Sequence, residues 1–275
     1  MDGIGKFAGS NSSRVWSGTV WGDCPVEALR AGLIEGCIWE KQFLTIPLVV
    51  PTTEAQYDDD LVAFSSTGGT MAMDTDEIGG GWKGGSDGDN EGASIRQIGQ
   101  PFKISLSNGD LWFEALVKTS TIADTKHGFF LGLIDAATLS ATVPIAADGT
   151  LADENLVGFH RLEADGDKVD CVYKADGVTA VTVQADAGTL VADTYTKLGM
   201  RFVPKRNIGN GPGYLTFYQD GVAIGSKLIP SAAGTDFPND VFMGFVFAIL
   251  NATGTTPGTS TIKKVRMAQL LNPLP

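Results

Sequence analysis

Three acidic residues between Glu163 and Asp167 are the nearest this chain comes to a pair of catalytic carboxylates. Retaining glycoside hydrolases hold two carboxyl groups close together, so that one acts as nucleophile and the other as acid and base. The pattern E-x-D-x-E achieves this on one face of a strand, but here the third acid is Asp167. The pair Asp165-Gly166 also predicts a turn in place of a strand. We therefore expect no hydrolytic site in this segment.

The acidic stretch from 87 to 92 matches the first half of a calcium-binding loop. Asp87, Asp89 and Glu91 occupy alternate positions and a glycine closes the run, and oxygen ligands at alternate positions suit a hard cation. The twelfth position is Ile98, where such loops need a bidentate Glu. Asp87, Asp89 and Glu91 are thus candidate calcium ligands, and calcium is the one cofactor that the sequence suggests. The alternative interpretation is a solvated acidic loop that binds no metal.

Few residues in this sequence could perform acid–base or redox chemistry. There are two histidines, His127 and His160, and His160 falls in a predicted strand as a packed or edge residue. Cys24, Cys37 and Cys171 are odd in number and form no C-x-x-C pattern, which predicts neither a disulfide framework nor a zinc site. Cys171 lies on the apolar face of a predicted strand. No G-x-S-x-G nucleophile elbow, which needs a helix after the serine, and no phosphate-binding loop is evident, so the sequence predicts a protein that is not an enzyme.

The elements that would position any site are predicted to be strands. Runs near 111–118, 168–174 and 197–202 alternate apolar and polar residues. The runs 129–134 and 241–249 are apolar on both faces, so we expect a second layer or another subunit to cover them. Turn dipeptides that favour tight hairpins punctuate this region: Asn108-Gly109, Asp148-Gly149, Asp165-Gly166, Asp176-Gly177 and Asp220-Gly221. The pattern predicts an all-β, two-sheet antiparallel jelly-roll sandwich.

Composition bounds the class of protein. The chain has 275 residues, of which 43% are hydrophobic, and its net charge of −12 opposes nucleic-acid binding unless a basic patch is segregated. No such patch is evident in the sequence; Lys263, Lys264 and Arg266 come closest and are interpreted as a solvated strand face. The start of the chain lacks a signal-peptide pattern and the longest apolar runs are too short to span a bilayer. We expect a protein made in the cytoplasm, with no membrane partner.

The first part of the chain differs from the rest. Residues 1–64 are predicted to be an extended docking arm with one short helix near 25–33, and residues 65–275 the jelly-roll domain. Burial of the arm's aromatic residues offsets too little of the ordering entropy for the arm to fold alone. Because Trp is enriched at interface hot spots, Trp16, Trp21, Trp39 and Phe43 are the candidate interface residues. Packing of the arm on its own sandwich is the alternative.

Several segments resemble known jelly rolls. Phe102 to Ser107 followed by Leu111-Trp112-Phe113-Glu114-Ala115-Leu116-Val117-Lys118 is similar to the opening of concanavalin A-like and laminin G-like domains, and 197–202, 215–222 and 261–270 are similar to their later strands. Together with 68–73 and 235–240, the stretch from 65 to 271 resembles head-associated or decoration proteins of tailed bacteriophages. That resemblance implies a structural protein located in a virion and assembled in the host cytoplasm. Its implied partners are other capsid or tail proteins, host surface glycans and further copies of itself.

Two functions of other classes remain open. In a carbohydrate-binding module, aromatic residues such as Trp112, Tyr173 or Tyr218 would stack on sugar rings. In a polysaccharide hydrolase, as in the laminarinase-type enzymes that share this jelly roll, Glu163 would be the first residue to test. The predicted function is nevertheless a virion structural protein, anchored through its N-terminal segment.

Overall fold

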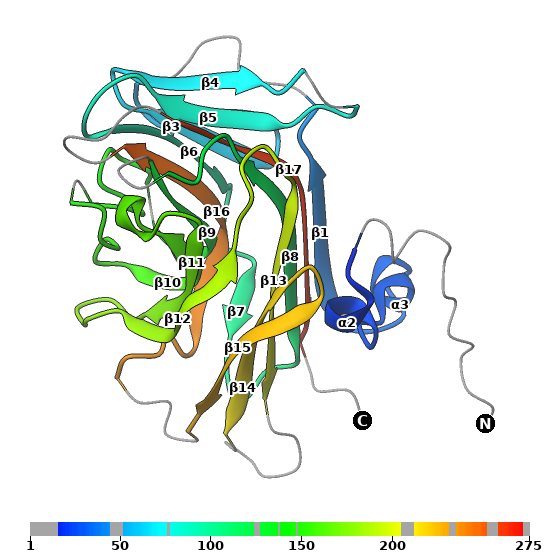
Figure 1. The fold of residues 1–275 in the computed structure, drawn as a ribbon. Coiled ribbons are helices and arrows are strands. Elements are labelled where there is room, and N and C mark those ends of the chain that lie inside the picture. The colour runs from blue at the N-terminus through cyan, green and yellow to red at the C-terminus, as the bar shows by residue number, and fades with distance from the viewer. Residues whose placement is uncertain are drawn as a thin grey trace, which may run out of the picture.

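Two antiparallel β-sheets pack face to face, as the sequence predicts (Figure 1). The computed structural model describes residues 16–44, 52–75, 78–123, 127–136, 138–146, 148–204, 212–230, 235–251 and 258–271. The described part of the chain contains two short helices, of four and five residues. Neither of these described helices has the length or apolar character needed to cross a lipid bilayer.

Sheet A runs in the order β15-β14-β13-β8-β17-β5-β4, and β1 also pairs with β17. Its strands are β1 (Gly36–Gln42), β4 (Gly69–Met73), β5 (Trp82–Ser86), β8 (Leu111–Thr119), β13 (Thr196–Pro204), β14 (Gly213–Gln219), β15 (Val222–Ile229) and β17 (Thr259–Leu270). The long strand β17 has β8 along one edge, while β5 and β1 share its other edge. Residues 36–42, predicted within the docking arm, thus form a strand of the sandwich.

Sheet B runs in the order β12-β11-β10-β9-β16-β6-β3-β2, and β7 also pairs with β16. Its strands are β2 (Ala55–Gln56), β3 (Leu61–Ser65), β6 (Glu91–Gln97), β7 (Phe102–Ile104), β9 (Gly128–Asp135), β10 (Asn155–Arg161), β11 (Lys168–Lys174), β12 (Val181–Thr189) and β16 (Val241–Asn251). A 3-10 turn, η1 (Glu163–Asp165), connects β10 to β11.

The predicted hairpin turn at Asp220-Gly221 connects β14 to β15. Asp220 has φ of 49° and Gly221 has φ of 82°, the positive values that a two-residue turn between antiparallel strands needs at both positions. On β14 the inward-facing Leu215 and Phe217 are fully buried. The turn chemistry and the alternating pattern of the flanking runs therefore agree, which is why this hairpin was predictable from the sequence.

The core between the sheets is rich in aromatic rings. Phe247 of β16 packs edge-on against Trp82 of β5, with ring centroids 5.9 Å apart, and lies 6.1 Å from Phe129 of β9. Phe159 and Phe217 make a second edge-to-face contact between the sheets at 5.3 Å. All five rings are at most 2% exposed. Such buried aromatic pairs contribute beyond their buried area, so they fix how the two layers sit against each other.

The two doubly apolar runs are covered within the chain. They form β9 and β16, whose inward residues join the main core and whose outward residues, including Phe130 and Val246, form a second cluster. Ala136, Leu139 and Ile145, from the segment that follows β9, pack on this outer face of sheet B. The predicted second layer is therefore supplied by the chain itself, although Phe242 at the start of β16 remains 57% exposed.

Residues 16–34, here called the N-terminal strap, lie on the outer face of sheet A. The strap contains α2 (Gly18–Trp21) and α3 (Val26–Arg30), which Figure 1 shows beside β1 and outside the sandwich. The helix predicted near 25–33 is found as α3, and α2 was not predicted. Trp16, Val20, Trp21 and Leu29 of the strap are all buried against this sheet.

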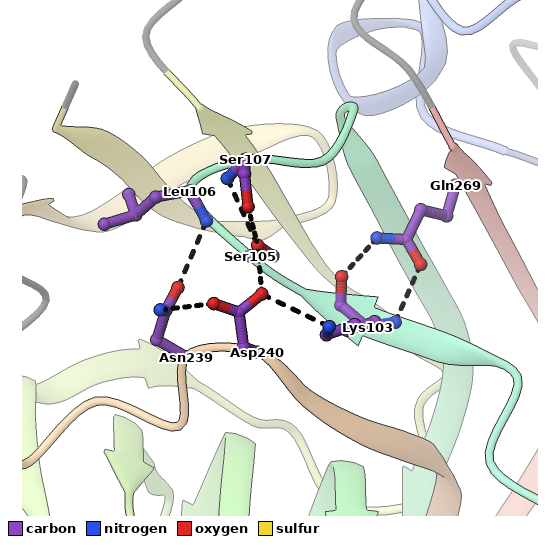
Figure 2. A network of polar contacts seen from close by, with 7 residues as sticks. All are labelled: Lys103, Ser105, Leu106, Ser107, Asn239, Asp240 and Gln269. Atoms are coloured by element: carbon purple, nitrogen blue, oxygen red, sulfur yellow. Dashed lines mark hydrogen bonds and ion pairs between the residues drawn. The ribbon is translucent and has the colours of Figure 1, made fainter. Parts of the chain in front are cut away.

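A network of polar contacts connects β7 to both sheets (Figure 2). Ser105 donates to Asp240 Oδ1 at 2.6 Å, and the Lys103 ammonium lies 3.3 Å from the same oxygen. The Gln269 side chain accepts from the Lys103 backbone N–H at 2.7 Å and donates to its carbonyl. Because Gln269 belongs to β17 and Asp240 precedes β16, this network holds the ends of the two sheets together. The Ser105 hydroxyl also lowers the pKa of Asp240.

Candidate functional site

The acidic segment 163–167 does not form a catalytic strand. Residues 163–165 are a 3-10 turn, and Gly166 follows with φ of 58°. The Asp165 carboxylate accepts a hydrogen bond from the Leu162 backbone N–H at 3.2 Å, so it caps the turn locally. The predicted turn is confirmed, so the backbone of this segment is not the strand that the E-x-D-x-E pattern requires.

Two of the three candidate calcium ligands lie against each other. Glu91 lies against Asp87, and burial together with that carboxyl raises the pKa of Glu91. Among the residues that the structure describes, no three His, Cys, Asp or Glu side chains are grouped so as to hold a metal ion. Calcium binding by Asp87, Asp89 and Glu91 stays a prediction.

Both histidines are buried. His160 is 6% exposed, its Nε2 lies 3.0 Å from the Gly149 carbonyl oxygen, and burial lowers its pKa to about 4. His127 Nε2 lies 2.7 Å from the Ser260 hydroxyl, a Ser–His contact between residues 133 positions apart that the sequence analysis missed. Ser260 is 2% exposed, so this hydroxyl has no open approach for a substrate. The contact therefore belongs to the core in this conformation.

The aromatic residues considered for sugar stacking are largely covered. Trp112 is fully buried and Tyr173 is 2% exposed, so neither ring is an open platform. Tyr218 is half-buried and packs against the cluster beneath the N-terminal strap. In the described conformation neither Trp112 nor Tyr173 can stack on a sugar, because both rings already pack within the protein.

The candidate interface residues pack within the chain. Trp16 and Trp21 are 6% and 5% exposed, and their indole rings lie 4.7 and 5.1 Å from the Arg266 guanidinium. Trp39 and Phe43 approach the core ring of Phe245, with centroids 5.6 and 6.3 Å apart. In the described conformation these four rings stabilise the contact between residues 16–43 and the sandwich.

A group of lysines gathers on the part of sheet A that the strap leaves uncovered. We call Lys118, Tyr195, Lys197, Lys263 and Lys264 the cationic patch. Leu116 of β8 pairs in register with Lys197 of β13 on one side and Lys264 of β17 on the other. The side chains of Lys197 and Lys264 therefore flank β8 on one face, about 10 Å apart by strand spacing. All members of the patch are half-buried.

A β-bulge in β17 builds part of this patch. The pairing of β17 with β8 shifts register between Ile262 and Lys264, so Lys263 is an extra residue in the strand. A bulge breaks strict alternation and re-aims side chains. Lys263 and Lys264 therefore both belong to the cationic patch. The Lys263 ammonium lies 5.2 Å from the Tyr195 ring centroid, and its positive charge lowers the pKa of Lys264.

Tyr195 is the aromatic centre of the patch. The Lys118 ammonium lies 4.9 Å from its ring centroid, and the tyrosine hydroxyl donates to Asp74 Oδ2 at 3.1 Å. Asp74 also binds Lys118 at 2.8 Å and its side chain is 2% exposed. This buried carboxylate fixes the Tyr195 ring and one lysine, so the aromatic surface is held in place before any ligand arrives.

Lys197 and Lys264 differ from Lys118, which is paired with Asp74. Neither Lys197 nor Lys264 forms an ion pair with a described residue. Burial lowers the pKa of Lys264, and the charges of Lys197 and Lys263 lower it further. In a chain with a net charge of −12, a cluster of repelling ammonium groups raises the local affinity for an anion. This patch is not evident in the sequence because its members come from distant segments.

Glu114 occupies the same face, beneath the strap. It is 1% exposed and accepts a hydrogen bond from the Ser17 backbone N–H at 2.8 Å. Burial raises the pKa of Glu114, while Ser17, Lys197 and the Trp21 side chain favour its charged form. Its cross-strand partner on β17 is Arg266, which pairs with Glu40 at 2.7 Å. A carboxyl group thus lies directly beside the patch, closed off by residues 16–21.

We expect Glu114→Gln to change how stability depends on pH. A carboxyl whose pKa is raised on folding favours the folded state fully below its unfolded pKa near 4.5, and this contribution declines as pH rises through the folded pKa. Glutamine keeps the acceptor for Ser17 and never ionises. The variant should therefore gain stability relative to wild type between pH 4 and pH 7, measured by urea unfolding. Glu27→Gln, at a side chain 77% exposed, is the control, and parallel curves for both variants would refute the burial effect.

Comparison with known proteins supports the fold. No protein family profile and no curated protein matches the chain by sequence. A protein of unknown function from Shewanella oneidensis MR-1 is similar in structure, with TM-score 0.55 and 11% identity over 90% of this chain and 94% of that one. An endo-beta-1,4-glucuronan lyase from the fungus Trichoderma reesei is also similar, with a TM-score of 0.53 and 11% sequence identity over 83% of this chain and 94% of the lyase. The chain has the concanavalin A-like jelly-roll fold.

A carbohydrate esterase from the Shiga toxin-encoding bacteriophage phi24B is also similar, with TM-score 0.46 and 15% identity over 84% of this chain and 100% of that one. At these identities the similarity establishes the fold alone.

The prediction that the chain is not an enzyme is wrong. It was inferred from a packed sandwich without a catalytic motif, yet the glucuronan lyase has the same fold over most of both chains. The physical reason is that catalytic side chains project from the faces and loops of a sandwich, so an apolar interior says nothing about chemistry outside it. The predicted location in a virion, the capsid partners and the homo-oligomer stay predictions.

Proposed function

We propose that this chain is a glycan-binding protein whose cationic patch takes an acidic, carboxylate-bearing polysaccharide. The observation that carries this proposal is a group of four lysines on one sheet face of an otherwise acidic protein, two of which, Lys118 and Lys263, lie over the Tyr195 ring. Lysine ammonium groups pair with carboxylates, and an aromatic ring beside them offers an apolar surface to the face of a sugar.

The geometry fits an extended sugar chain. Lys197 and Lys264 flank β8 about 10 Å apart, a span comparable to a two-sugar repeat, so alternate carboxylates of one chain could meet both. A sheet face is also wide and shallow, as a linear polymer requires. The fold is compatible with this function, since the T. reesei protein with TM-score 0.53 is a glucuronan lyase.

A carboxylated glycan is favoured over a nucleic acid for an electrostatic reason. Nucleic acid carries dense phosphate charge, and the net charge of −12 repels it beyond the small area of the patch. A uronate chain carries fewer charges per length and presents apolar sugar faces to Tyr195. If the chain is a virion component, as its sequence resemblance predicts, the ligand is a host surface polysaccharide.

The test is calorimetric titration with three ligands of equal length: an oligouronate, a neutral oligoglucoside and single-stranded DNA. We expect binding to the oligouronate that weakens as salt rises, because ion pairs at a surface are screened, and at least tenfold weaker binding to the other two. Equal affinity for the oligouronate and the neutral oligoglucoside would show that the lysines do not contribute to binding. Tighter binding to DNA than to the oligouronate would indicate that the ligand of the patch is a nucleic acid and not a glycan.

A further inference from the structure

The glycan site extends beneath the N-terminal strap. We infer that residues 16–34 cover a second half of the site and are displaced by a ligand chain longer than the cationic patch. This inference rests on the proposed function and adds a gate to it.

The strap is held by side-chain packing on sheet A. Its helices have four and five residues, and helices this short are not stable by themselves. Val20 fits above Gly199 of β13, where an added Cβ would lie 3.3 Å from Val20 Cγ2. A glycine at that point in the sheet leaves a depression, and Val20 fills it. The depression would open if the strap left.

Beneath the strap lies a face suited to a polar ligand with apolar surfaces. Strand register places Tyr218, Gly199, Glu114 and Arg266 in one row across β14, β13, β8 and β17. A neighbouring row contains Trp112 and Arg201, whose guanidinium lies 5.7 Å from the Trp112 ring. Aromatic rings, a carboxylate and two guanidinium groups are therefore presented by adjacent strands.

The strap leaves some buried polar atoms of this face without hydrogen-bond partners. Glu114 Oε1 has no hydrogen bond of normal geometry, although the Trp21 side chain is near enough to favour its charge. Arg201 Nε has no hydrogen-bond partner, while its terminal nitrogen pairs with Asp23 and with Asp110. Buried polar atoms without partners weaken the interface that covers them. Sugar hydroxyls, which both donate and accept, could supply the missing bonds.

Trp16 is the boundary between the open patch and the covered face. Its ring lies 5.2 Å from the Lys264 ammonium and 4.7 Å from the Arg266 guanidinium. Lys264 therefore contributes both to the open patch and to the contact that holds the strap. A ligand carboxylate that binds Lys264 competes with Trp16 for this cation, and the strap is loosened from the end at which the ligand arrives.

The experiment compares a short oligouronate of two to four sugars with one of ten or more, on the full chain. Hydrogen–deuterium exchange should show faster exchange of strap amides 18–31 with the long ligand and no change with the short one. Val20→Ala should raise affinity for the long ligand at least about fivefold, because it raises the fraction of molecules with the strap released, and leave affinity for the short ligand unchanged. Leu33→Ala, at a strap side chain 77% exposed, is the matched control.

The outcomes separate the two proposals. Binding of both ligands with unaltered strap exchange, and equal affinities in wild type and Val20→Ala, would overturn the gate and leave the cationic patch as the whole site. Binding of neither ligand would overturn the proposed function together with the gate. Slower exchange of the strap amides with the long ligand would also overturn the gate, since the strap would then be part of the surface that binds the ligand.

Discussion

Reversing the charge of two patch lysines, Lys197→Glu with Lys264→Glu, is expected to weaken oligouronate binding at least about 100-fold. Each charge-assisted hydrogen bond contributes about 1.5 to 3 kcal/mol, and each tenfold in affinity corresponds to about 1.4 kcal/mol. Both side chains lie on the open face, and neither pairs with an acid among the described residues. The loss is measured by calorimetry at low salt.

The matched control is Lys168→Glu with Lys227→Glu. These lysines lie on β11 and β15, outside the patch, and the change alters net charge by the same amount. If binding depends on overall charge, both double variants lose affinity equally, which contradicts a local site. Lys197→Gln with Lys264→Gln keeps the side-chain volume without reversing charge, and an intermediate loss is expected. Circular dichroism that matches wild type confirms that each variant is folded.

Truncation of a core ring, Phe247→Ala, should lower the free energy of unfolding by about 3 to 5 kcal/mol. Phe247 is fully buried and contacts rings from both sheets, Trp82 of β5 and Phe129 of β9. Removing it leaves a cavity at the centre of the sandwich. Folded proteins are stable by about 5 to 15 kcal/mol, so this single change removes a large part of that total. Urea unfolding at pH 7 measures it.

The same strand supplies the control. Phe242 of β16 is 57% exposed and its ring lies 5.3 Å from the Lys103 ammonium, so Phe242→Ala should cost less than about 1 kcal/mol. A cost at Phe242 equal to that at Phe247 would contradict the assignment of the core side of β16. It would indicate that the start of this strand is covered, as in the predicted homo-oligomer.

Local chemistry explains which parts of the fold were predictable. The Asp220-Gly221 turn carries its own conformational preference, and β8 alternates apolar and polar residues, so the sequence alone indicates both. β1 was missed because its first four residues are half-buried in succession, without the alternation that marks a strand. It pairs with β17, more than 200 positions later, through register that the local sequence does not specify.

The candidate site depends on similar long-range pairing. Lys118, Lys197 and Lys264 come together only because β8 lies between β13 and β17, and the bulge that adds Lys263 has no local sequence signal. The aromatic residues were recognised by type, yet their burial depends on which sheet face the strap covers. Trp16 and Trp21 were expected to contact a partner, and in the structure they contact Arg266 of the same chain.

The most direct test of the cationic patch is a crystal structure of the full chain with a bound oligouronate. We expect sugar density across β13, β8 and β17, with carboxylates at Lys197 and Lys264 and a sugar face on Tyr195. Density at any other surface, with these side chains arranged as they are without ligand, would contradict it.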